Sequence, residues 1–168
     1  MKAALLLVAG AMAALLDLTV TPGIRALGGH PSVCVALVAV WAVLRRREEA
    51  MVLAPATGLM LGLLGNEPLG ASIVGLAPAV LLASRRDPDV TEGRFVAALG
   101  IAAVSAAAYV AVVALAGAAT GGGIPSPAET LRAMAGTAVL TAPIAALVYW
   151  PVARAAWQPR VRGQFRRY

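Results

Sequence analysis

The sequence is poor in the residues on which most enzymes and metal-binding proteins depend. Charged residues make up 13% of its 168 positions, and it has one cysteine, Cys34, and one histidine, His30. A single cysteine excludes an internal disulfide and a zinc site built from several cysteines. Neither a Gly-x-Ser-x-Gly motif nor a Gly-rich loop followed by Lys-Ser/Thr is present. The sequence therefore predicts no catalytic, cofactor-binding or metal site.

Apolar sequence, in contrast, is abundant. Hydrophobic residues make up 60% of the chain and the mean hydropathy is +0.82, whereas soluble domains are roughly 45–50% apolar. The excess lies in long runs such as 95–119, which contains no charge. Because a helix needs about 20 apolar residues to cross a bilayer, the composition predicts an all-α polytopic membrane protein. The net charge of +6 does not indicate nucleic-acid binding, since the arginines are spread between apolar runs.

Six apolar runs predict six transmembrane helices in a single membrane domain. They cover residues 3–20, 27–44, 50–65, 69–84, 95–119 and 131–152, and a basic tail follows at 153–168. The third and fourth runs are short, lie close together and contain Pro55 and Pro78, so we expect a kinked hairpin that either crosses or re-enters the membrane. The first run resembles a signal peptide as well, but we interpret it as a retained helix.

The arginines set the orientation of the predicted helices. Twelve of the 14 basic residues lie at the termini and in the even-numbered loops, and only Arg25 and Arg132 lie on the other side. Because short loops rich in Lys and Arg stay in the cytoplasm, we expect a multi-pass protein of the bacterial inner membrane with both termini cytoplasmic. Anionic lipids are the expected partners of a set of membrane-interface residues: Arg45, Arg46, Arg47, Arg85, Arg86, Trp150, Arg154 and Trp157.

Asp17 is the one charged residue in the interior of a predicted span, near its outer end, since Arg132 lies at the very start of the sixth. Two interpretations are open: a solvated carboxylate at the interface, or a polar contact for a partner or for Arg25. Small residues also mark the third and fourth runs, and these allow helix backbones to approach closely. We expect a partner's transmembrane helix to dock there, which gives a partner-binding set of Asp17, Gly58, Gly62, Gly65, Pro68 and Gly70.

Four short motifs resemble one family. They are LDLTVTP at 16–22, HPS at 30–32, GLMLGLLG at 58–65 and PLG at 68–70. In this order and spacing they are similar to the rod shape-determining protein MreD family, small multi-pass proteins of the bacterial elongation machinery. The resemblance covers residues 4–86, and the last two runs match in length and hydrophobicity only. The family often has glutamine at the position of Asp17 and aspartate at that of Ser32.

The resemblance implies a non-enzymatic scaffold in the cell-wall elongation (Rod) complex. Proteins of this family pair with MreC, a single-span coiled-coil protein, and support RodA and its class B transpeptidase in peptidoglycan synthesis and cell shape. The family is similar in fold to the substrate-binding subunits of energy-coupling-factor transporters. The alternative function is therefore a vitamin-binding transport subunit, which would need a polar pocket that faces outward.

Overall fold

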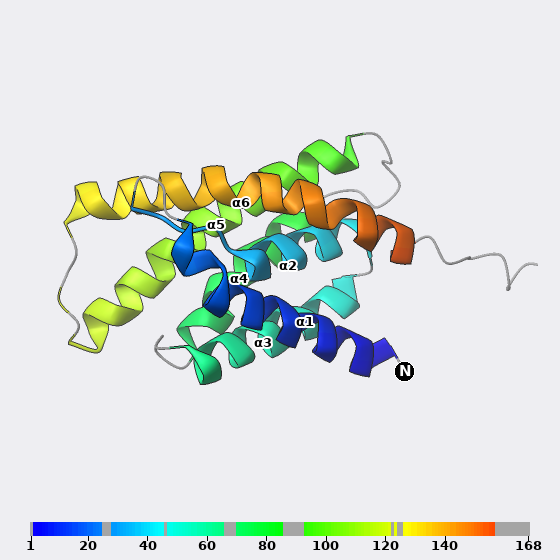
Figure 1. Cartoon of the computed structure of the whole chain (residues 1–168), viewed down its shortest axis with the longest axis horizontal. Coiled ribbons are helices and arrows are strands. Elements are labelled where there is room, and N and C mark those ends of the chain that lie inside the picture. The colour runs from blue at the N-terminus through cyan, green and yellow to red at the C-terminus, as the bar shows by residue number, and fades with distance from the viewer. Residues whose placement is uncertain are drawn as a thin grey trace, which may run out of the picture.

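The computed structural model describes residues 2–24, 28–45, 47–65, 70–85, 93–121, 123 and 126–156. These residues form α-helices with one short 3-10 helix and no β-strand, which confirms the predicted all-α class (Figure 1). The elements are α1 (Lys2–Thr19), η1 (Thr21–Gly23), α2 (Val33–Leu44), α3 (Arg47–Leu64), α4 (Ala71–Ser84), α5 (Arg94–Ala119) and α6 (Pro127–Ala156).

Two serines set where α2 and α6 begin. Ser32 has an extended backbone, and its hydroxyl accepts a hydrogen bond from the backbone N–H of Val35 at 3.2 Å, which is the usual N-cap arrangement. At α6, the N–H of Glu129 donates to Ser126 Oγ, and the N–H of Ser126 donates to Glu129 Oε2, both at 3.2 Å. This reciprocal pair is a capping box, and it starts α6 four residues before the predicted span at 131.

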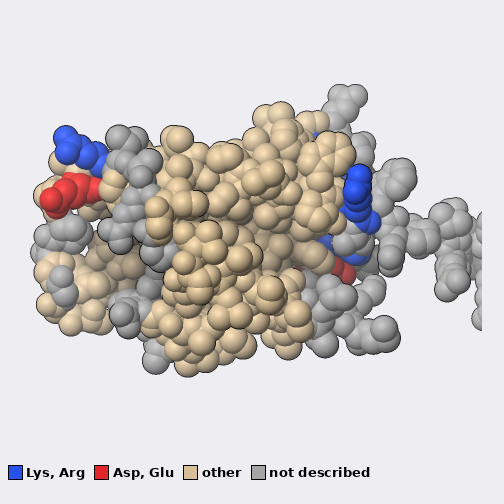
Figure 2. Space-filling view, viewed as in Figure 1, with Lys and Arg blue, Asp and Glu red and all other residues tan. Residues whose placement is uncertain are grey.

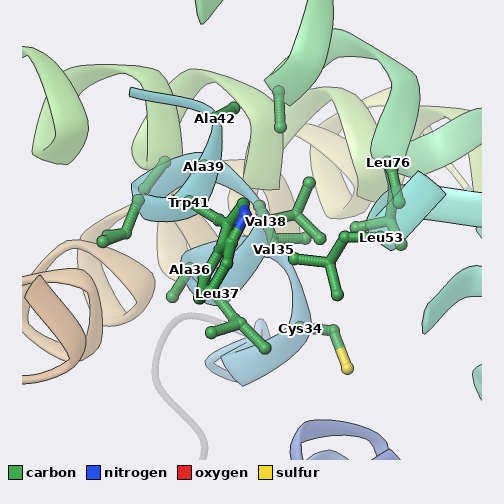
Figure 3. Packing of buried hydrophobic residues seen from close by; sticks show 14 of the residues in the cluster. Cys34, Val35, Ala36, Leu37, Val38, Ala39, Trp41, Ala42, Leu53 and Leu76 are labelled. Atoms are coloured by element: carbon green, nitrogen blue, oxygen red, sulfur yellow. The ribbon is translucent and has the colours of Figure 1, made fainter. Parts of the chain in front are cut away.

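The central helix of the bundle is α2. It contacts each of the other five helices, and the nine residues from Cys34 to Ala42 are all buried. Figure 3 shows its side chains packed together with Leu53 of α3 and Leu76 of α4. A helix that is apolar on every side belongs inside a protein, and this position explains why residues 33–44 show no polar face.

The two C-terminal helices are the longest. At a rise of 1.5 Å per residue, α5 spans about 39 Å and α6 about 45 Å. Among the described residues, only these two helices are both long and apolar enough to cross a membrane, with mean hydropathy of 2.3 and 1.6 in their most apolar stretches. Only 28% and 22% of those stretches are buried, so most of each apolar stretch lies at the surface of the molecule.

Of the remaining helices, α2 and α4 are shorter than a full crossing, with 12 and 14 residues, while α1 and α3 have 18 residues each. With 12 residues, α2 reaches only about 18 Å, because residues 28–32 of the predicted run are not helical. Pro55 and Pro78 lie inside α3 and α4, and both helices continue through them. By length and composition the structure thus supports two crossings, where the sequence predicts six.

The charged side chains visible on the surface lie at the two ends of the molecule. Figure 2 shows several basic side chains and an acidic one at one end, a basic and an acidic side chain at the other, and an uncharged face between them. We call the first the arginine end and define it by the ends of α2, α4 and α6 and the start of α5, where Arg45, Arg85, Arg154 and Arg94 lie. Large apolar side chains are exposed on α5 and α6, such as Leu115, Val139 and Leu147 at 72%, 67% and 75%. An apolar surface of this extent favours membrane association.

Candidate functional site

A buried carboxylate joins α1 to the start of α2. Asp17 lies in the last turn of α1 and is only 9% exposed. Its Oδ1 accepts a hydrogen bond from the N–H of Val33 at 2.5 Å, and its Oδ2 accepts from the N–H of Cys34 at 2.9 Å and from the hydroxyl of Ser32 at 3.0 Å. The carboxylate therefore caps α2 from a neighbouring helix.

Thr141 of α6 completes this arrangement. The N–H of Ser32 donates to Thr141 Oγ1 at 3.1 Å, and Thr141 is fully buried. We call Asp17, Ser32, Val33, Cys34 and Thr141 the α2 cap. Because Thr141 lies 14 residues after the start of α6, the α2 cap is about 20 Å along that helix from its beginning. The start of α2 is therefore deep inside the bundle and far from the end where α6 begins.

The irregular segment 28–32 lies directly on α6. A Cβ atom added to Gly29 would come within 2.5 Å of the carbonyl oxygen of Ala133 and of the backbone nitrogen of Thr137. Only glycine allows this backbone contact, since any side chain would collide with the main chain of α6. The main chain of α6 therefore buries the non-helical backbone at Gly29.

The physical role of Asp17 follows from these contacts. The first N–H groups of a helix have no partner within the helix, and at a buried position each unpaired group costs about 1–3 kcal/mol. Asp17 satisfies two of them and also places a negative charge at the positive end of the α2 dipole. The interpretation of Asp17 as a solvated interfacial carboxylate is thus wrong. Arg25, its suggested partner, lies outside the described residues.

A cavity lies at the end opposite the arginine end, between α5 and α6. Its volume is about 790 Å³, and the described residues that line it are Gly28, Val110, Ala114, Glu129, Thr130, Arg132 and Ala133. The walls are mainly apolar, with the polar groups of Glu129, Thr130 and Arg132 on α6. Glu129 already accepts a hydrogen bond in the capping box, whereas Arg132 makes no ion pair with any described residue. Sequence reasoning did not identify this cavity.

One glycine of the predicted partner-binding set packs against another helix of the same chain. A Cβ atom on Gly58 would lie 2.7 Å from the Cα atom of Ile73 in α4, so this glycine allows α3 and α4 to approach closely. Gly62 is buried as well. In the structure α4 occupies the face of Gly58, and docking of a partner's helix at this set stays a prediction. Gly65 is partly exposed, Gly70 begins α4 with φ of 92°, and Pro68 lies outside the described residues.

The membrane-interface residues that the structure describes lie at the arginine end. The guanidinium of Arg45 lies 5.5 Å from the ring centroid of Trp41, a cation–π distance. Arg85 and Arg154 are exposed, and Trp150 is 65% exposed beside the ring of Tyr149. Arg47 is the first residue of α3. Arg46, Arg86 and Trp157 lie outside the described residues.

The structure brings Asp17 together with two residues, Ser32 and Thr141, that are not in the predicted partner-binding set. Ser32 directly precedes an apolar run, which is the ordinary signal of an N-cap, and this signal could have placed the start of α2. Thr141 gives no signal, since nothing in the sequence indicates that a threonine in the last helix lies beside residue 32. Among the described residues no group of three or more His, Cys, Asp or Glu is placed to hold a metal ion.

Comparison with known proteins adds no relative to this description. No protein-family model, curated protein or solved structure matches the chain. The functional argument therefore rests on the α2 cap, the cavity and the motifs in the sequence.

Proposed function

We propose that the chain is a non-enzymatic membrane scaffold of the bacterial cell-wall elongation complex, similar to MreD, which binds MreC and supports RodA and its class B transpeptidase. One observation carries the proposal. Two of the motifs that resemble the family, 16–22 and 30–32, lie together in the α2 cap, where the hydroxyl of Ser32 donates a hydrogen bond to Asp17 at 3.0 Å. This contact supports the pairing of the two motifs, although Asp17 and Ser32 stand where the family often has glutamine and aspartate.

In this proposal all six helices are embedded in the inner membrane and the arginine end faces the cytoplasm. α5 and α6 cross fully, while α2 is held at membrane depth by its neighbours and needs no lipid contact. Single cysteines at positions 47, 88, 123 and 165, in a Cys34→Ala background, test the orientation. We expect an impermeant thiol reagent to label position 123 from outside and the other three only from inside. Any other pattern refutes the proposed topology.

Affinity purification in a mild detergent tests the partner. We expect a single-span protein with a coiled-coil domain to be recovered in a fixed ratio to this chain, and cells depleted of the chain to lose their rod shape. Recovery of the chain alone, from cells that keep their shape without it, refutes the scaffold function.

The alternative, a vitamin-binding transport subunit, has one feature in its favour, the cavity opposite the arginine end. A polar vitamin needs several convergent hydrogen-bonding groups in its site. The described lining offers only Glu129, Thr130 and Arg132 among apolar residues, and Glu129 is partly used by the capping box. This lining supports the scaffold over the transport subunit. A vitamin that co-purifies with the chain, detected by native mass spectrometry, would reverse that preference.

A further inference from the structure

The cavity lies where α5 and α6 diverge. The two helices lie close together at mid-length and separate toward the end opposite the arginine end, so that the last turns of α5 and the first turns of α6 form a wedge (Figure 1). Val110 and Ala114, one turn apart on α5, form one wall, while Thr130 and Ala133 of α6 form the other. Gly28 lies between the two walls. The space of about 790 Å³ is within the range of sites that enclose an organic ligand.

The polar groups of the cavity have a particular chemistry. Glu129 and Arg132 lie three residues apart on α6, which places their Cβ atoms about 5–6 Å apart on one face. Both side chains are exposed, and no ion pair joins them. One oxygen of Glu129 accepts the N–H of Ser126, which leaves the other available, and Arg132 has no charged partner among the described residues. A headgroup that carries both a phosphate and an ammonium group fits this pair of opposite charges.

The residues around the cavity favour a ligand whose headgroup is attached to an acyl chain. Leu115 of α5 and Leu131 of α6, next in sequence to lining residues, are 72% and 65% exposed. The apolar surface therefore continues from the cavity walls onto the outer face of the two helices. Arg132 lies only about 8 Å along α6 from its start, which corresponds to the headgroup region when the end opposite the arginine end faces outward.

We infer that the cavity binds a phospholipid of the outer leaflet whose headgroup carries a phosphate and an ammonium group. Arg132 binds the phosphate, Glu129 binds the ammonium group, and one acyl chain lies against Val110 and Ala114. Guanidinium groups bind phosphate with two parallel hydrogen bonds, which makes Arg132 the main contact. This inference rests on the membrane orientation of the proposed function, but it requires neither MreC nor the synthases.

Lipid titration by native mass spectrometry tests the inference. Three lipids with the same acyl chains are compared: phosphatidylethanolamine, phosphatidylglycerol and diacylglycerol. We expect the full-length protein to retain them in that order. Arg132→Gln should weaken retention of both phospholipids by about three- to five-fold, the scale of a solvent-accessible ion pair. Glu129→Gln should weaken retention of phosphatidylethanolamine alone.

Arg154→Gln is the comparison variant, because it removes an exposed arginine from the other end of the same helix. As an expected contact for anionic lipids, Arg154 affects phosphatidylglycerol, so the comparison is made on phosphatidylethanolamine. Equal retention of the three lipids, or equal losses of phosphatidylethanolamine in Arg132→Gln and Arg154→Gln, overturns the inference. So does a small soluble ligand found in place of a lipid. Ala114→Phe, which fills the cavity, should abolish the preference for phosphatidylethanolamine, whereas Val139→Phe on the exposed face of α6 should preserve it.

Recovery of the coiled-coil partner is measured on the same preparations, so the two proposals fail separately. If the partner is recovered but the lipid preference is absent, the lipid site is refuted and the scaffold function stands. If the lipid preference is present without any partner, the scaffold function is refuted and the lipid site stands.

Discussion

Replacing Asp17 with asparagine tests whether the α2 cap holds the centre of the bundle together. Asparagine has nearly the same shape, but one of its two terminal groups is a donor. If its oxygen replaces Oδ2, the bonds from Ser32 and Cys34 persist and the new NH₂ group faces the N–H of Val33, where Oδ1 now accepts at 2.5 Å. The variant thus loses one charge-assisted hydrogen bond, and its new NH₂ donor lies against the N–H donor of Val33. We expect the free energy of unfolding to fall by about 2–3 kcal/mol.

Cys34 provides the assay. It is the only cysteine of the chain, it is the second residue of α2, and it is fully buried. Its reaction with a membrane-permeant maleimide therefore requires local opening at the start of α2. Since about 1.4 kcal/mol corresponds to a tenfold change in an opening equilibrium, a loss of about 2 kcal/mol predicts labelling about 30-fold faster in Asp17→Asn.

Glu129→Gln is the control for this experiment, because Glu129 is also a carboxylate at the start of a helix, but an exposed one. We expect its effect on unfolding to be much smaller and the labelling of Cys34 to stay at the wild-type rate. If Asp17→Asn labels as slowly as the wild type and unfolds at the same denaturant concentration, the carboxylate does not hold α2, and the role assigned to it is refuted.

Three further substitutions follow from the packing. Gly58→Ala should destabilise the protein by about 2 kcal/mol, because its new Cβ would lie 2.7 Å from the Cα atom of Ile73. Gly100→Ala is the control, since a Cβ added there meets no atom within 4 Å. Equal unfolding curves for the two variants would contradict the close approach of α3 and α4. Gly29→Ala should displace segment 28–32 from α6 and should therefore speed the labelling of Cys34 at the start of α2. Labelling of Cys34 at the wild-type rate would show that Gly29 does not pack closely against α6. Ser105→Ala should stabilise the protein by up to about 1 kcal/mol, because the buried hydroxyl has no hydrogen-bond partner among the residues that the structure describes. A loss of stability in denaturation instead would reveal a partner for it.

The all-α class and the general position of the helices could be predicted because they depend on local properties. Apolar runs bounded by charges predict helices directly, and the arginine triplet at 45–47 indicated the end of α2 at Leu44. The start of α2 was predicted too early, at 27 instead of 33. The predicted run joined the Gly-Gly-His-Pro-Ser segment at 28–32 to the apolar stretch that follows it, whereas the helix begins only after the N-cap Ser32.

The faces of the helices could not be predicted in the same way. Gly58 and Gly62 form the pattern expected of a helix-docking surface, but the pattern does not say whether the docked helix belongs to the same chain. In the structure α4 occupies the face of Gly58. The cavity likewise depends on the angle between α5 and α6, and Arg132, which the sequence identified only as an exception to the charge asymmetry, is one of its lining residues.

Segment 28–32 links the two candidate sites in space. Gly28 lines the cavity, Gly29 lies against the main chain of α6, and Ser32 begins α2 and donates its hydroxyl proton to Asp17. A run of five residues thus extends from the cavity to the α2 cap, with no helix of its own to hold it. Its position depends on the contact of Gly29 with the main chain of α6 and on the hydrogen bonds of Ser32 to Thr141 of α6 and to Asp17 of α1. The segment that lines the cavity at Gly28 is therefore the same segment that determines where the central helix begins.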